Sequence, residues 1–257
     1  MKQEAKRISP GVWTLLGLVI ALALWEAAAA GGHVKEFFFS RPSLLWQEFL
    51  TMLSNGMLAK HLSVTCQEAG LGLLFGGVFG TLAGLGLGMS PRVSRALMPL
   101  MTGLNGLPKL ALGPLFIIWF GLGLRSKVLI AALMVFFIFA FNLYAGVRSV
   151  DQELVNAVRL LGATRGQVLG KVIWPTCLPW LLASLRTGLG LALSGAIVGE
   201  YLGSTRGMGW LLSAAGDVFN AQRVLCCVLI LVVIIVLLDG LLRLAEHFLL
   251  RWRETAH

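Results

Sequence analysis

The sequence predicts an all-α protein that crosses a membrane about six times. Of its 257 residues, 57% are apolar and only 13% are charged, and the mean hydropathy is +0.83. A water-soluble domain is instead about half apolar and about a quarter charged. Because a membrane-spanning helix needs about 20 mostly apolar residues, this length holds roughly six spans and no large soluble domain beside them. A self-contained soluble enzyme is therefore excluded.

Six apolar stretches are the expected spans. After a cytoplasmic N-terminal segment at 1–11, they lie at 12–30, 64–89, 97–120, 128–147, 176–200 and 224–243 of a single domain, 1–257. The first stretch is longer than the roughly 7–15 apolar residues of a signal peptide, so we interpret it as a retained anchor. The small residues at 27–30 leave a cleavable signal peptide open as the alternative.

The Lys and Arg residues predict that both termini are cytoplasmic, because cytoplasmic segments near the ends of spans carry an excess of them. With both termini inside, the inside segments hold twelve of these residues and the outside segments hold seven. The net charge of +9 raises the alternative of a nucleic-acid partner. However, the basic residues stand at the ends of apolar runs and form no single patch. We therefore expect membrane lipid, and no nucleic acid, as a partner.

Small residues recur at every fourth position in two of the spans. They are Gly72, Gly76, Gly80, Gly84 and Gly88 in the second span, and Ser184, Gly188, Ala192 and Ala196 in the fifth. This spacing places each set on one helical face. A neighbouring helix can approach such a face closely and gain contacts that lipid does not supply. Both faces are predicted to pack against other helices.

The segment 149–174, between the fourth and fifth spans, carries the pattern of two cytoplasmic helices. Ser149 and Gln152 have the spacing of a capping box, which predicts a helix from about Val150. The apolar positions of this helix predict one buried face, and they are Leu154, Val155, Val158 and Leu161. Gly162 is then expected to end the helix in a left-handed conformation.

A second helix is predicted to follow in the same segment. Thr164 and Gln167 form another candidate capping box, and Pro175 is expected to interrupt the helix before the fifth span. An amphipathic helix in a membrane loop has two interpretations. It lies on anionic lipid, which its basic residues favour, or it is a docking element for a soluble partner. The pattern alone fits both equally.

The segment also resembles the EAA motif of ABC importer permease subunits. That motif reads Glu-Ala-Ala, three residues, Gly, nine residues, and then Ile-x-Leu-Pro. This chain has Asn156-Ala157-Val158, Gly162 and Val172-Ile173-Trp174-Pro175 at the same spacing. The runs 114–121, 161–165 and 198–202 make the chain similar to the branch of binding-protein-dependent permeases for nitrate, taurine and other sulfonates, bicarbonate and thiamine-precursor pyrimidines. The resemblance covers about 63–253 and also Arg41-Pro42-Ser43 before it.

The resemblance implies the membrane-spanning subunit of an ATP-driven importer of type I architecture in the bacterial cytoplasmic (inner) membrane. The implied partners are two copies of an ATPase subunit, a second copy of this chain in a homodimer, and an extracytoplasmic substrate-binding protein. Motion of 150–165 with the ATPase would swing the adjoining spans. The residues implied to couple to the ATPase are Asn156, Ala157, Val158, Arg159, Leu161, Gly162, Ala163, Thr164 and Arg165.

The chain departs from the motif at two positions. Asn156 stands where the motif has Glu, and Trp174 stands where it has Leu. Any ion pair that this Glu makes with the ATPase is therefore absent. Asn156 keeps the ability to hydrogen-bond, and Asp151 and Glu153 are nearby carboxylates able to substitute electrostatically.

No residue is assigned to catalysis or to a metal, and no cofactor is expected on this chain. The closest approach to a phosphate-binding loop, at 166–172, has three residues between its glycines instead of four and Val172 where Ser or Thr would hold magnesium. ATP and magnesium are therefore expected in the partner ATPase subunit. The four cysteines form no C-x-x-C pair and are interpreted as small apolar packing residues.

Polar, aromatic and ionisable residues within the spans are candidates for the substrate pathway, because charge is retained in a span mainly where it faces protein or water. They are Asn105, Lys109, Trp119, Asn142, Arg186 and Glu200. Lys109 follows Pro108 in a span that Pro114 also breaks, so freed carbonyl groups can line a cavity there. Glu200 is expected near the outer surface.

Lys109 favours a small organic or inorganic anion as the substrate, such as taurine, an aliphatic sulfonate or nitrate. A neutral small molecule, such as a thiamine-precursor pyrimidine, is the alternative. An ion-coupled secondary transporter is less favoured, because it usually has broken helices at corresponding places in two repeats, and only one broken span is expected here. A channel has no need of the two capped cytoplasmic helices.

Overall fold

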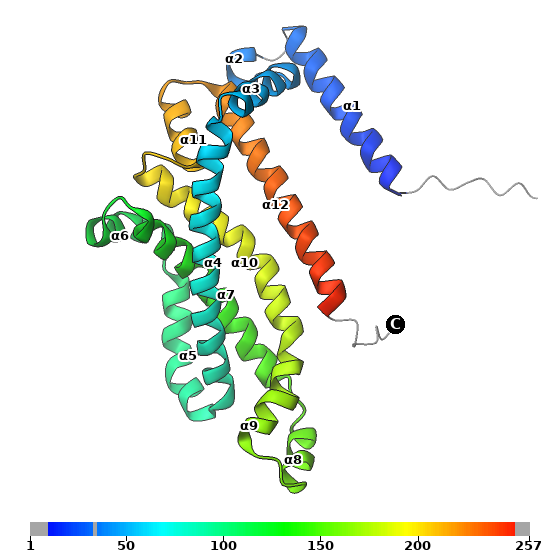
Figure 1. The fold of residues 1–257 in the computed structure, drawn as a ribbon, viewed down its shortest axis with the longest axis vertical. Helices are drawn as coiled ribbons and strands as arrows, with labels where there is room; N and C mark the ends of the chain where they lie inside the picture. Colours follow the sequence, from blue (N-terminus) through cyan, green and yellow to red (C-terminus); the bar gives the residue numbers. More distant parts are fainter. Residues whose placement is uncertain (1–9, 33–34, 250–257) are drawn as a thin grey trace, which may run out of the picture. The chain divides into compact units, whose positions relative to one another are not determined.

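The computed structural model describes residues 10–32 and 35–249, and nearly all of them are helical (Figure 1). The helices are α1 (Pro10–Ala30), α2 (Glu36–Phe39), α3 (Pro42–Ser54), α4 (Met57–Met89), α5 (Pro91–Gly106), α6 (Gly113–Phe120), α7 (Leu124–Arg148), α8 (Gln152–Leu160), α9 (Arg165–Val168), α10 (Trp174–Leu202), α11 (Met208–Asp217) and α12 (Ala221–Leu249). A 3₁₀ turn covers Lys109–Leu112 and a π turn covers Leu169–Ile173. Because the described ranges contain no strand, the all-α prediction is confirmed.

Several helices are long and apolar enough to cross a membrane, as a multi-pass protein requires. Four pass this test among the described residues, and they are Met57–Met89, Leu124–Arg148, Arg165–Leu202 and Ala221–Glu246. These helices contain the stretches 64–89, 128–147, 176–200 and 224–243. The apolar part of α1, Leu16–Ala30, is shorter, so the first span remains a prediction.

The stretch 97–120 is two helical pieces and not one straight span. α5 ends at Gly106, and the helical segment that resumes at Lys109 is turned by 81°. Pro108 has no N–H group to donate and forces the residue before it out of the helical region. Leu107 accordingly has an extended conformation, with ψ at 140°.

The directions of the neighbouring helices show that these two pieces form one crossing. α4 and α7 run in the same direction, because Gly72 faces Ala131 and Gly88 faces Val147. The chain between them must therefore lead from one face of the membrane to the other. The bent pair is a single broken span and not a loop that returns to the side from which it came.

The chain divides into two compact units, one within Met1–Ala59 and Leu211–Ile230 and the other within Lys60–Trp210 and Leu231–His257. Polar contacts join the helices of the first unit. The Glu26 carboxylate on α1 accepts hydrogen bonds from the backbone N–H and the hydroxyl of Ser43 on α3, at 2.9 and 2.8 Å. The Arg223 guanidinium on α12 pairs with Glu48 on α3 at 2.6 Å.

In the second unit, α4 packs against α7 through its glycines. A Cβ atom added at Gly80 would overlap the carbonyl oxygen of Phe136, and the glycines one turn before and one turn after meet the carbonyl oxygens of Ala132 and Ala140 in the same way. Only residues without a side chain permit this approach of two backbones. The predicted packing face is confirmed, and its partner is α7.

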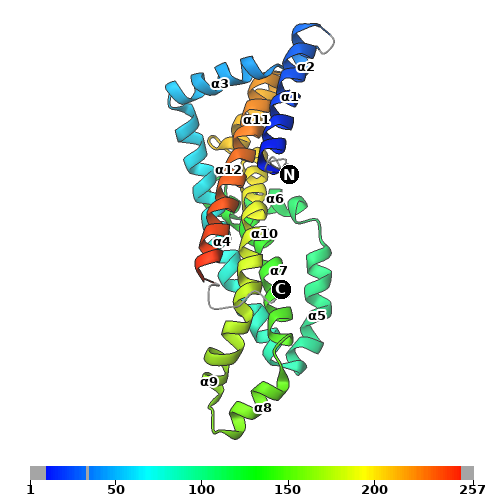
Figure 2. The same ribbon diagram turned by 90° about the vertical axis from the view of Figure 1, so that its right-hand side faces the viewer.

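The small-residue face of α10 packs against α7 as well. Ser184, Ala192 and Ala196 are each at most 1% exposed, and Gly188 lies against the ring of Phe139. α7 thus packs against both α4 and α10. Figure 2 shows α8 and α9 at the end of α7 and α10 that is remote from α6.

Candidate functional site

The first helix of the segment 149–174 begins later than the sequence predicts. Asp151 is its N-cap, with its Oδ1 atom accepting from the Glu153 N–H at 2.8 Å. The Ser149 hydroxyl instead donates to the carbonyl oxygen of Gly146 at 2.8 Å. The predicted Ser149 cap is wrong because Ser149 still has the helical backbone conformation of the end of α7, whereas an N-cap residue is extended.

The end of this helix agrees with the prediction made for Gly162. Its φ is +85°, the left-handed conformation that glycine adopts without strain. The Gly162 N–H donates to the Arg159 carbonyl at 2.9 Å, and the Ala163 N–H donates to the Val158 carbonyl at 3.1 Å. These two bonds are the Schellman arrangement that satisfies the last carbonyl groups of a helix.

The second helix begins as predicted but does not end at Pro175. Thr164 and Gln167 form the full capping box, with the Gln167 N–H donating to the Thr164 hydroxyl at 3.3 Å and the Thr164 N–H donating to the Gln167 side chain at 2.8 Å. α9 then continues through the π turn into α10, so that Arg165–Leu202 is one helical segment. Pro175 is tolerated because it lies in the first turn of α10, directly after a π turn with a different hydrogen-bond register.

The tip between α8 and α9 exposes two leucines. Val150, Val155, Val168 and Val172 form a small buried core under the two helices. Leu161 does not join this core, contrary to prediction, because the helix ends at Leu160 and the chain turns away at Gly162. Leu160 is 90% exposed and Leu161 is 87% exposed. The exposure of Leu160 was not predicted from the sequence. The sequence feature that indicates it is the position of Leu160 at the end of the helix, two residues before Gly162.

The other residues proposed to couple to an ATPase surround this tip. Asn156, Ala157, Arg159, Gly162, Thr164 and Arg165 are exposed, and Val158 and Ala163 are half-buried. Their helices are shaped by hydrogen bonds within the segment itself. The segment therefore presents a preformed surface of exposed leucines with polar neighbours.

Two of the pathway candidates meet at the break in the third span. The Lys109 Nζ atom donates to the carbonyl oxygen of Asn105 at 2.7 Å and to its side-chain Oδ1 atom at 3.0 Å. The same ammonium group lies 5.0 Å from the centre of the Phe137 ring. The carbonyl oxygen of Asn105 is available because α5 ends at Gly106, one residue later. Trp119, on α6, is 61% exposed and packs edge-on against Phe116 and Phe120.

Two other candidates bind to neighbouring helices. The Asn142 side chain on α7 donates to the Ser184 hydroxyl on α10 at 3.0 Å. The Arg186 guanidinium on α10 pairs with Asp239 and with Glu246 on α12, each at 3.0 Å. The positive charge of Arg186 is thus already balanced by carboxylates.

Glu200 is not on a surface. It is 1% exposed, and its two carboxylate oxygens accept hydrogen bonds from Thr65 and from the backbone of Gly209. The position of Glu200 near the outer side of the membrane stays a prediction, and its carboxylate is covered by protein. The carboxylate holds together three segments of protein.

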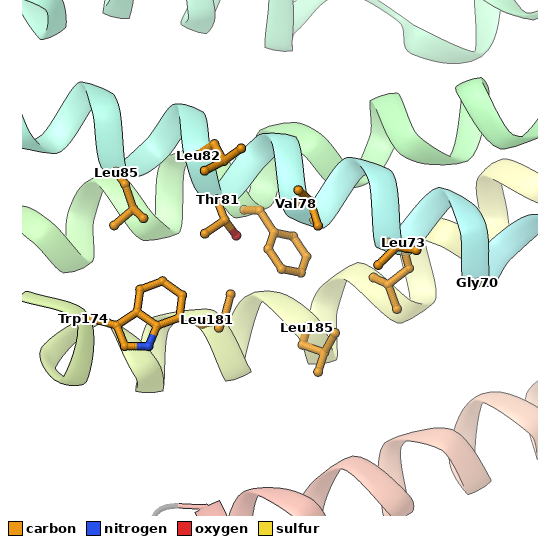
Figure 3. A pocket seen from close by; sticks show the side chains of 12 residues that line it. Gly70, Leu73, Val78, Thr81, Leu82, Leu85, Trp174, Leu181 and Leu185 are labelled. Carbon is orange, nitrogen blue, oxygen red and sulfur yellow. The ribbon is translucent and has the colours of Figure 1, made fainter. Parts of the chain in front are cut away.

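An apolar groove of about 570 Å³ lies between α4 and α10. Figure 3 shows its wall, in which leucines from both helices face one another and Trp174 stands at one end. Thr81 contributes a hydroxyl among otherwise apolar side chains. None of the six pathway candidates lines this groove, and its chemistry suits an acyl chain or a helix better than an ionic substrate.

Comparison with known proteins identifies the family. The model of the family described as "Binding-protein-dependent transport system inner membrane component" matches residues 76–251. The chain belongs to this family. It is a multi-pass inner-membrane permease of an ABC importer for a small solute, a transport component whose family works with an ATPase and a substrate-binding protein.

Named relatives of the permease carry different substrates in their names. It is 34% identical to the putative aliphatic sulfonates transport permease protein SsuC of Bacillus subtilis, over 98% of this chain and 94% of the relative. It is 34% identical to the riboflavin transport system permease protein RibX of Chloroflexus aurantiacus, over 97% of each chain. It is 33% identical to the taurine transport system permease protein TauC of Escherichia coli, over 91% of this chain and 87% of the relative.

A solved structure shares the fold of the permease. The inward-facing MetNI methionine ABC transporter matches with a TM-score of 0.64 and 20% sequence identity, over 74% of this chain and 93% of that chain. This likeness supports the predicted permease architecture and says nothing of the substrate.

Proposed function

We propose that this permease forms the pathway for a small organic or inorganic anion, such as taurine, an aliphatic sulfonate or nitrate, and that an ATPase subunit binds it through residues 150–165. In this proposal two copies of the chain assemble with two ATPase subunits and one binding protein. ATP and magnesium are held by the ATPase subunits, and the permease supplies the pathway and the moving helices.

The observation that carries the docking proposal is the exposure of Leu160 and Leu161. Fully burying one leucine side chain stabilises a contact by about 1.5–3 kcal/mol, so two adjacent exposed leucines favour a protein surface that covers them. Their position on the cytoplasmic side follows from the Lys and Arg distribution. Figure 1 shows α8 and α9 beyond the ends of α7 and α10, where a soluble subunit can reach them.

The docking proposal is tested by copurification of the ATPase with the tagged permease. Leu160→Ser together with Leu161→Ser should reduce the ATPase recovered by at least about tenfold, since most of the apolar contact is lost. Leu154→Ser is the matched control, because Leu154 lies in the first turn of α8 and is 49% exposed. Recovery of the ATPase at the wild-type level with the double variant would contradict the proposal.

An anionic substrate is favoured by the contrast between Lys109 and Arg186. Lys109 contacts uncharged groups, and no carboxylate pairs with it in the part of the chain that the structure describes. Arg186 has two carboxylate partners. The relatives named for sulfonates and taurine agree with an anion, and the relatives named for riboflavin and formylaminopyrimidine keep a neutral heterocycle as the alternative.

The substrate is identified by ATP hydrolysis of the complex in lipid with its binding protein. Taurine, ethanesulfonate, nitrate, riboflavin and formylaminopyrimidine are compared as added ligands. An anion should stimulate hydrolysis, Lys109→Met should lower that stimulation by about tenfold, and Lys109→Arg should retain most of it, because a buried anion needs a compensating charge. Stimulation by riboflavin or the pyrimidine alone would favour the neutral alternative.

A further inference from the structure

Three backbone N–H groups at the start of α11 are bound by side chains of other helices. The first N–H groups of a helix have no partner within it. Here the Gly207 N–H donates to the His61 Nδ1 atom at 3.0 Å, the Met208 N–H donates to the Thr65 hydroxyl at 2.8 Å, and the Gly209 N–H donates to the Glu200 carboxylate at 2.6 Å. The start of α11 is therefore capped from α4 and α10.

Thr65 and Glu200 are joined directly inside this cap. The Thr65 hydroxyl donates to the Glu200 Oε1 atom at 2.7 Å, so the same hydroxyl donates to Glu200 and accepts from Met208. Thr65 is 0% exposed and Glu200 is 1% exposed. A carboxylate at a helix N-terminus is favoured by the helix dipole and makes charge-assisted bonds. We refer to Thr65, Glu200 and the N–H groups of 207–209 as the outer clasp.

The glycines of the outer clasp permit its geometry. Gly207 has a φ of +109°, and a Cβ atom added there or at Gly209 would overlap the Glu200 side chain. The loop 203–207 is thus held close against α10. Its exposed side carries Thr205 and Arg206.

A second loop is fixed beside the first. The Lys127 side chain is 4% exposed, and its Nζ atom donates to the carbonyl oxygen of Leu122 at 2.6 Å and lies 4.0 Å from the Glu68 Oε1 atom. Gly203 faces the side chain of Leu122. The turn 121–123 and the loop 203–207 therefore form one surface. The buried side chains of Lys127 and Glu200 hold these two segments in place.

The outer clasp and the proposed ATPase-docking segment are at opposite ends of one helical segment, Arg165–Leu202. From Trp174 to Glu200 the helix rises by about 39 Å, at 1.5 Å for each residue. Pro179 lies inside this helix, but the helix continues past it to Leu202, so its cytoplasmic and outer ends belong to one element. At that end the bonds of the clasp connect the helix to Gly207–Gly209, directly after the loop 203–207.

We propose that Glu200, together with Thr65, is a positioning residue that makes the loop 203–207 move with α10, so that the surface of 121–123 and 203–207 meets the extracytoplasmic binding protein in a state that depends on the ATPase. This inference rests on the proposed function. A purely structural role of the clasp would stabilise the fold without affecting the communication between binding protein and ATPase.

The test uses the complete complex in lipid nanodiscs and the variant Thr65→Val. Valine has nearly the shape of threonine and removes the hydrogen bonds of the hydroxyl to Glu200, to the Met208 N–H and to the His61 carbonyl. Hydrogen exchange of the peptide containing Gly207–Gly209 should accelerate roughly tenfold, as for a lost helix cap. The ratio of ATP hydrolysis with the loaded binding protein to hydrolysis without it should fall by about fivefold or more. Unstimulated hydrolysis and recovery of the ATPase should not change.

Two further variants serve as controls. Thr65→Ser keeps the hydroxyl and should restore both the exchange rate and the stimulation ratio. Thr51→Val makes the same substitution in α3, where the hydroxyl donates only within its own helix, to the Gln47 carbonyl at 2.9 Å, and it should behave as wild type. The binding protein is loaded with the compound that stimulates ATP hydrolysis of the wild-type complex most strongly.

Three results would overturn the inference. The first is unchanged exchange in Thr65→Val, and the second is faster exchange with an unchanged stimulation ratio, which is the result of a purely structural clasp. If Thr65→Val does not fold, Glu200→Gln replaces it, and a folded Glu200→Gln complex with a full stimulation ratio is the third. Failure of the proposed function gives a different pattern, in which the wild-type permease itself recovers no ATPase.

Discussion

The segment of α8 and α9 and the outer clasp are both shaped by hydrogen bonds at helix ends, but over very different distances along the chain. The caps of α8 and α9 join residues two and three positions apart. Three of the four bonds of the clasp join residues 135, 143 and 146 positions apart, and the fourth joins Glu200 to Gly209, nine positions apart. Leu160 at the tip of the segment is 90% exposed, whereas Glu200 is 1% exposed.

The segment of α8 and α9 is therefore a surface that can bind another subunit. The clasp is an interaction that is already formed within the chain. The segment of α8 and α9 satisfies its own backbone groups and leaves two leucines uncovered for another subunit. The clasp satisfies backbone groups of one helix with side chains of two others, so it exists only once those helices have packed. Substitutions in the packed region should therefore affect the whole protein, and substitutions in the segment should remain local.

The largest effect is expected where α4 meets α7. Gly80→Leu places a side chain against the carbonyl oxygen of Phe136 and should destabilise the permease by about 3 kcal/mol or more, because the two backbones must separate. Thermal unfolding in detergent and the yield of monodisperse protein measure this. Gly86→Leu is the control on the same helix, since a Cβ atom there meets nothing within 4 Å. Equal losses for both variants would contradict the packing described here.

A smaller but still global effect is expected at the clasp. Gly207→Ala should destabilise the permease by about 2 kcal/mol or more, since alanine is strained at a φ of +109° and its Cβ atom overlaps the Glu200 carboxylate. The expected result is a lower unfolding temperature. An unfolding temperature equal to that of the wild type would show that Glu200 does not hold this loop in solution.

Gly162→Ala should lower the free energy of unfolding less than Gly207→Ala. The φ of Gly162 is +85°, but a Cβ atom there meets nothing within 4 Å, so Gly162→Ala carries only the left-handed penalty of about 1–2 kcal/mol. The effect should be confined to faster hydrogen exchange in α8. Gly166→Ala is the matched control, because Gly166 is helical and open, and alanine there should slightly stabilise α9. If Gly162→Ala lowered the unfolding temperature as much as Gly207→Ala does, the expectation that substitutions in the segment of α8 and α9 remain local would be wrong.

The smallest effect is expected at the start of α8. Asp151→Ala removes one N-cap bond and should destabilise the first turn by about 1 kcal/mol, which hydrogen exchange of residues 152–155 detects. Ser149→Ala should leave that turn unchanged, because the Ser149 hydroxyl donates to Gly146 at the end of α7. Faster exchange in Ser149→Ala than in Asp151→Ala would instead support the Ser149 cap that the sequence predicts.

Patterns of short range were predicted well because their hydrogen bonds close within a few residues. The capping box of Thr164 and Gln167 and the left-handed Gly162 both depend only on local backbone geometry. The error at Ser149 and the error at Pro175 have one cause: each residue belongs to a longer helix whose extent is decided by packing. Leu161 was misplaced because its periodicity continued past the point at which the helix ends.

By itself, the sequence determined that the chain is a helical membrane protein, that α4 and α10 carry faces for close packing, and that a glycine-ended helix pair separates two spans. These properties follow from apolar length, residue spacing and local capping, which act without regard to distant parts of the chain. Only the tertiary structure decided that α7 receives both small-residue faces, that Lys109 lies over the ring of Phe137, and that Glu200 is buried as a cap for α11. Each of these depends on which distant groups the fold brings into contact, and burial makes a hydrogen-bond partner for Glu200 necessary without specifying where in the sequence that partner lies.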